Sequence, residues 1–126
     1  MAYETKYTNT ADLIAVEVFG KRKKGKEVLE AVGFLEEIAG RCIKSNVSKV
    51  LIISHITGFI TTQDVMNILS IFSNNVFSHG LKIAVFFIQS DSDRYNSFTE
   101  FIAKNRGLDM KVFNSEEEAR VWLDTP

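Results

Sequence analysis

Three things are scarce in this chain of 126 residues: cysteine, proline and net charge. Cys42 is the only cysteine, so an internal disulfide and a metal site built from several cysteines are both excluded. The only proline is Pro126, so no proline interrupts a helix or strand further inside the chain. Because structural disulfides are typical of oxidising compartments, we expect a cytoplasmic protein.

The charges nearly cancel, with 15 basic and 16 acidic side chains and a net charge of −1. Such a chain has no overall field that would attract nucleic acid. No apolar run approaches the roughly 20 residues of a transmembrane helix, and the first residues lack the apolar core of a signal peptide. We therefore expect neither a nucleic-acid partner nor a transmembrane segment.

The length and the apolar content of 45% are those of one domain, spanning residues 1–126. Alternation over residues 3–7 and 13–19 predicts an opening hairpin. The apolar runs 50–53 and 81–88 predict strands that are buried on both faces, and 110–113 predicts a last strand. Apolar residues at helical spacing lie between these strands.

Four helices are predicted. The first spans Glu27–Lys44, the second begins at Thr61, the third ends at Arg106-Gly107, and the fourth begins at Ser115, which forms a capping box with Glu118. The positions expected to face inward are Val28, Val32, Leu35, Ala39 and Cys42, then Val65, Ile68, Leu69, Phe72 and Val76, then Tyr95, Phe98, Phe101 and Ile102, and finally Ala119, Trp122 and Leu123. The order β-β-α-β-α-β-α-β-α predicts an α/β protein with one mostly parallel sheet of four to five strands, flanked by four helices.

This order, together with several short motifs, resembles the SpoIIAA-like (STAS-like) domain family. The motifs are Lys82-Ile-Ala-Val85, the helix end Lys104-Asn-Arg-Gly107, and Val112-Phe113 followed by Glu117-Glu-Ala-x-x-Trp122-Leu123. The specific match covers residues 81–123. Such domains are similar to anti-sigma-factor antagonists and to CRAL-TRIO lipid-binding domains. The resemblance implies a binding or regulatory module rather than an enzyme.

Open α/β sheets usually bind ligands beyond the carboxyl ends of their strands. If the strands at 13–19, 50–53 and 81–88 are parallel, the segments 20–26, 54–62 and 89–93 lie at one such edge. The first segment is dense in Lys and Arg and is either a solvated loop or a contact for an anion or an acidic partner. The candidate binding residues are Lys21, Arg22, Lys23, His55, Thr57, Gly58, Phe59, Thr61, Thr62, Ser90 and Asp91.

The start of the second helix is a candidate switch. The resemblance to anti-sigma antagonists implies a phosphorylatable serine there, within an Asp-Ser-Ser-Gly type motif. The corresponding stretch Phe59–Asp64 has hydroxyl groups but neither the serine pair nor the glycine. Thr61 and Thr62 are therefore the candidate phosphorylation sites, and the alternative is that these hydroxyls only cap the helix.

The sequence shows no catalytic arrangement. His55 has no evident carboxylate or nucleophile partner, and His79 is too far along the chain to form a metal-binding motif with it. Cys42 lies on the inward stripe of the first helix, so we expect a buried, unreactive thiol. We predict no enzyme activity, no cofactor and no metal.

Ten phenylalanines are many for this length, and a surplus beyond the core can line an apolar pocket or a homodimer face. The leading hypothesis is a non-enzymatic regulatory or scaffold module that binds a protein partner through the second helix and the adjacent loops. The alternative is a carrier or sensor of a small apolar or lipid-like ligand.

Overall fold

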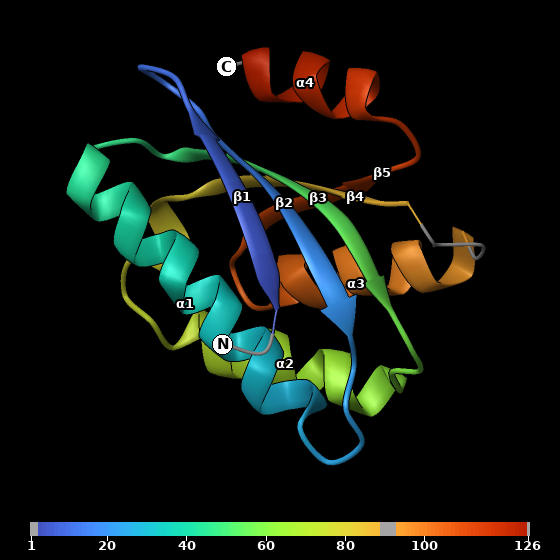
Figure 1. The fold of residues 1–126 in the computed structure, drawn as a ribbon. Helices are drawn as coiled ribbons and strands as arrows, with labels where there is room; N and C mark the ends of the chain where they lie inside the picture. Colours follow the sequence, from blue (N-terminus) through green and yellow to red (C-terminus); the bar gives the residue numbers. More distant parts are fainter. Residues whose placement is uncertain (1–2, 89–92, 126) are drawn as a thin grey trace.

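The computed structural model describes residues 3–88 and 93–125, and all their side chains except those of 93–95. The elements are β1 (Glu4–Asn9), β2 (Ile14–Lys21), α1 (Glu27–Ser45), β3 (Lys49–Thr57), α2 (Thr62–Ser73), the short 3-10 helix η1 (Ser78–Gly80), β4 (Lys82–Phe87), α3 (Asp93–Asn105), β5 (Asp109–Phe113) and α4 (Glu116–Asp124) (Figure 1). This order confirms the predicted β-β-α-β-α-β-α-β-α arrangement.

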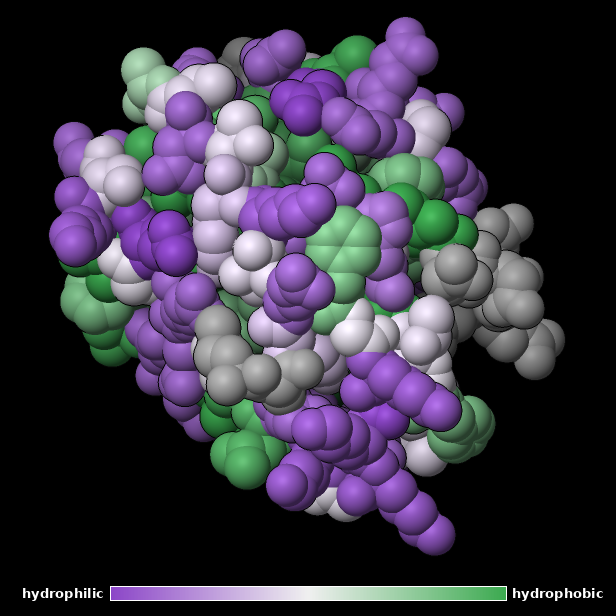
Figure 2. Space-filling view, in the orientation of Figure 1, coloured by the Kyte–Doolittle hydropathy of each residue, from purple (hydrophilic) through white to green (hydrophobic). Residues whose placement is uncertain are grey.

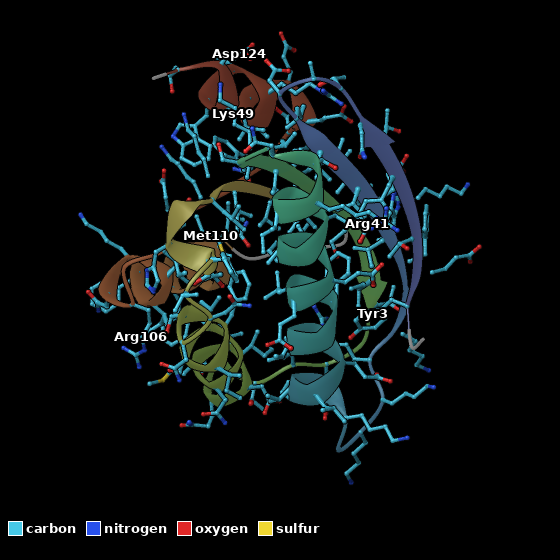
Figure 3. The ribbon with its side chains drawn as sticks, turned by 90° about the vertical axis from the view of Figure 1, so that its left-hand side faces the viewer. Tyr3, Arg41, Lys49, Arg106, Met110 and Asp124 are labelled. Atoms are coloured by element: carbon cyan, nitrogen blue, oxygen red, sulfur yellow. The ribbon has the colours of Figure 1, made fainter. Side chains whose placement is uncertain are left out.

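The five strands form one sheet in the order β1-β2-β3-β4-β5. β1 is antiparallel to β2, and the other neighbours are parallel. Connections between parallel strands are right-handed, so stepping in one direction across the sheet places every connecting helix on the same face. Accordingly, α1, α2 and α3 cover one face, whereas α4 lies apart from them at the top of Figures 1 and 3.

The main core lies between α1–α3 and one face of the sheet. Alternate residues of β2 point into it, with Ile14, Val16 and Val18 at most 1% exposed. Phe72 of α2 and Ile38 of α1 are among the largest fully buried side chains. A smaller cluster joins the other face to α4 and consists of Leu51, Ile53, Ala84, Ala119 and Leu123.

The predicted helix ends are present. Thr61 Oγ1 accepts a hydrogen bond from the Asp64 amide at 3.0 Å, and the Asp64 carboxylate accepts one from the Thr61 amide at 3.5 Å. Gly107 ends α3 with a φ of 76°, a conformation that glycine adopts without strain. Ser115 caps α4 by accepting from the Glu118 amide at 3.1 Å, which is one of the two hydrogen bonds of the capping box predicted there. These contacts confirm the helix starts read from Thr61 and Ser115.

β3 is longer than predicted and ends at Thr57, not at Ile53. The reason lies in its neighbour, because β2 continues to Lys21 and pairs with β3 up to the register Lys21↔Thr57. The expectation that Ser54–Thr62 is one loop was therefore wrong for residues 54–57. Only residues 58–61 connect β3 to α2.

One valine and one phenylalanine that were predicted to face the core are exposed. Val76 is 77% exposed because α2 ends at Ser73, before that residue is reached. Phe101 is 61% exposed, whereas Thr99 and Ala103 of the same helix are buried. Two residues along a helix correspond to a rotation of about 200°, so Phe101 lies on nearly the opposite side of α3 from the buried Thr99. Polar residues on the inner face of α3 thus obscured its apolar pattern.

Replacing a buried phenylalanine should be far more costly than replacing an exposed one in the neighbouring helix. We expect Phe72→Ala to lower the free energy of unfolding by about 3 to 5 kcal/mol, because it leaves a cavity in the main core. The matched control Phe101→Ala should change it by less than about 0.5 kcal/mol. Urea unfolding followed by circular dichroism measures both values, and equal losses would contradict this assignment of the core.

Candidate binding site

The segments that follow β2 and β3 are joined by hydrogen bonds. The Arg22 amide donates to the Thr57 carbonyl at 2.9 Å, and the Arg22 guanidinium donates to the Gly58 carbonyl at 2.7 Å. Gly58 has a φ of 104°, and a Cβ at this position would lie 3.2 Å from Arg22 Cβ. Glycine therefore allows both the turn and the close approach. We call residues 20–26 and 58–62 together the rim.

The rim presents positive charge and one exposed aromatic side chain. Lys21, Lys23, Lys24 and Lys26 are exposed, and hydrophilic side chains gather at the lower edge of the molecule, where the β2–α1 loop lies (Figure 2). Phe59 is 78% exposed. Ser90 and Asp91 lie outside the described residues, so the structure brings together two of the three segments proposed from sequence.

A pocket lies beneath the rim, between the sheet and helices α1, α2 and α3. Its volume is about 120 Å³, and its wall is mostly apolar, with Phe34, Ile60 and Phe87 among the lining residues. Tyr3, just before β1, and Met110, on β5 at the other edge of the sheet, also line it and are labelled in Figure 3. Ligand sites are usually concave and mostly apolar with a few polar groups, so this pocket is a candidate ligand site.

Few polar groups line the pocket. They belong to Tyr3, Arg22, Ser54 and Thr99, and of the described lining residues only Arg22 is charged. Burial raises the pKa of the Tyr3 phenol, while the nearby positive charge of Arg22 opposes that rise. The Tyr3 ring packs edge to face on Phe34, with centroids 6.3 Å apart. Arg22 therefore belongs to both the rim and the pocket wall.

His55 does not line the pocket. Successive residues of a strand point to opposite faces, so His55 points away from the pocket that its neighbours Ser54 and Ile56 line. Its ring stacks on Phe19 at 4.3 Å, and its Nε2 is hydrogen-bonded to Glu17 Oε2 at 3.0 Å. His55 therefore lies near the carboxyl end of β3 but on the other face of the sheet, and its role in binding stays a prediction.

Glu17 is the carboxylate partner that sequence reasoning missed, because it lies 38 residues before His55. The signal that could have found it was the register of β2 with β3, in which Phe19 pairs with His55. A His–Glu pair orients an imidazole, but general base catalysis also needs a reacting group held within hydrogen-bond reach. The pair alone defines no reaction.

Other site chemistry is limited. Within the described parts of the chain, no three His, Cys, Asp or Glu side chains are grouped so that they could hold a metal ion. None of the described helices is long and apolar enough to cross a membrane.

Cys42 is 2% exposed, and burial raises the pKa of its thiol to about 11. Its predicted burial is confirmed.

Comparison with known proteins bears on the fold. No protein-family model matches the sequence, and no curated protein is significantly similar to it. A solved structure of the anti-sigma factor antagonist SpoIIAA in its unphosphorylated form is similar over 99% of this chain and 100% of that chain, with a TM-score of 0.50 and 15% sequence identity. The protein has a STAS-like fold. At this level of identity the likeness shows the fold and assigns no activity.

The Cys42 thiol should be protected in the folded protein. We expect negligible reaction with a thiol reagent below pH 9 until the protein is unfolded, because the folded thiol ionises only near pH 11. Since the unfolded thiol loses its proton from about pH 9, the stability that this group contributes is lost as the pH rises from about 9 to about 11.

Urea unfolding at both ends of this range measures that loss. The Cys42→Ala variant should lose less stability than the wild type between the two pH values, while the burial of Tyr7, which raises its pKa to about 12, affects both proteins alike. Rapid labelling of the folded wild type would contradict the buried position.

Proposed function

We propose that the protein is a non-enzymatic regulatory or scaffold module that binds a protein partner through the rim and the start of α2. The observation that carries this proposal is Phe59, which is 78% exposed and follows the residue that Arg22 holds in place. Burial of a phenylalanine contributes about 1.5 to 3 kcal/mol, enough for a central interface contact. The exposed lysines beside it favour an acidic partner surface.

The start of α2 supplies a candidate control point. Thr61 is the N-cap residue, and Thr62 is the exposed first residue of the helix. A phosphate on either hydroxyl would add about −1.5 to −2 charges at a helix N-terminus, where free amides favour anions. It would also partly neutralise the field of the adjacent basic segment. In this proposal, phosphorylation alters capture of an acidic partner.

Phe59→Ala should weaken capture of the partner, while Phe101→Ala, which removes another exposed phenylalanine, should leave it unchanged. We expect the double variant Thr61→Ala/Thr62→Ala to weaken capture relative to the unphosphorylated wild type, because it removes two exposed hydroxyl groups from the proposed contact surface. Thermal unfolding checks its loss of about 1 kcal/mol of helix capping. Affinity capture from extracts of the protein's own cells, with quantitative mass spectrometry, compares the four proteins. Identical captured sets would contradict the proposal.

A second candidate function rests on the pocket. We propose that the protein instead, or in addition, carries or senses a small apolar ligand. The pocket of about 120 Å³ approaches the roughly 150 Å³ of an engineered apolar cavity that binds benzene. Its wall is apolar, with a few polar groups that can orient a ligand.

Intact-mass measurements on protein from its own cells distinguish a carried ligand from a covalent phosphate. Under native conditions, a carried ligand adds mass that disappears on denaturation, whereas a phosphate adds mass that persists. We expect the added mass of a ligand if the protein is a carrier, and the added mass of a phosphate if the start of α2 is phosphorylated. The native spectrum also reports whether the chain is a homodimer. A bare mass under both conditions would count against a resident ligand and constitutive phosphorylation.

A further inference from the structure

Arg22 is the one charged residue among the described residues that line the pocket. Arg22 is the first residue after β2 and lies within the basic segment. It lines the pocket together with Tyr3 and Ile60. Its hydrogen bond to the Gly58 carbonyl uses one of the five N–H groups of a guanidinium. Because its backbone amide also bonds to Thr57, the side chain extends from a fixed point.

The surroundings of Arg22 are positive on balance. Four exposed lysines lie within five residues of it in the sequence, at positions 21, 23, 24 and 26. The carboxylates of Glu27 and Glu30, on the first turn of α1, oppose them. Both carboxylates raise the pKa of the Tyr3 phenol, whereas Arg22 lowers it. Five basic groups against two acidic ones leave a net attraction for an anion over residues 21–30.

We propose that the pocket takes a small apolar carboxylic acid, with its chain or ring in the cavity and its carboxylate on the Arg22 guanidinium. This inference rests on the proposed ligand-binding function and names the ligand class. A guanidinium matches a carboxylate through paired N–H donors, a contact that an alcohol or an amine cannot reproduce. The volume of about 120 Å³ suits a short acyl chain or a single ring, not a whole phospholipid.

Nuclear magnetic resonance titration of methyl-labelled protein with octanoate, 1-octanol and octylamine tests this class directly. Octanoate should bind about tenfold more tightly than 1-octanol, as a partly screened charge-assisted contact implies, and octylamine should bind most weakly. Methyl signals of Ile60, Val65 and Leu69 in the wall should shift. Those of Leu51 and Leu123, on the other sheet face, should not.

Variants separate the role of Arg22 from general attraction to lysines. Arg22→Gln should bind octanoate and 1-octanol equally, and its retained 1-octanol binding shows that the pocket is intact. Arg22→Lys should keep part of the preference for the acid. The control Lys23→Gln/Lys24→Gln, which changes exposed residues outside the pocket wall, should keep most of it.

Each contrary result has a distinct meaning. Equal wild-type affinity for octanoate and 1-octanol would overturn the acid preference while leaving an apolar-ligand function in place. A preference that survives in Arg22→Gln would overturn the assignment of the carboxylate to this residue. If none of the three compounds shifts the pocket methyl signals, both the acid proposal and the ligand-binding function fail.

Discussion

The handedness of the crossovers between parallel strands shapes the molecule. Because β2, β3, β4 and β5 are added in sequence order, three right-handed connections place α1, α2 and α3 on one face. Their parallel pairing brings the carboxyl ends of these four strands to one edge of the sheet. The rim lies at that edge, and the pocket lies beneath it between the sheet and the three helices, while α4 covers only part of the other face.

The rim and the pocket share residues, which links the two candidate functions. Ile60 lines the pocket, whereas its neighbours Phe59 and Thr61 are exposed. Arg22 lines the same pocket and fixes the Gly58 carbonyl from the opposite segment. A ligand that contacts Arg22 and Ile60 would therefore bear on the conformation of the surface that meets a partner. Ligand binding and partner binding would then influence each other reciprocally.

Local patterns predicted the elements well, and tertiary pairing decided the rest. The run 50–53 showed a buried strand, but its extension to Thr57 depends on β2, which no local pattern reveals. The parallel strands placed the basic segment beside Gly58, yet the pocket arises from three helices that meet only in the fold. The strand was predicted to end at Ile53, four residues before Thr57, and this hid the face of the sheet toward which His55 points.

The proposed ligand site is the pocket beneath the rim, with Arg22 in its wall. A crystal structure of the protein purified from its own cells, without added detergent, tests it most directly. We expect the pocket of about 120 Å³ to be preserved and to hold elongated or ring-shaped density that ends at the Arg22 guanidinium. A cavity filled by Phe34, Ile60 and Phe87, with Arg22 turned into solvent, would contradict it.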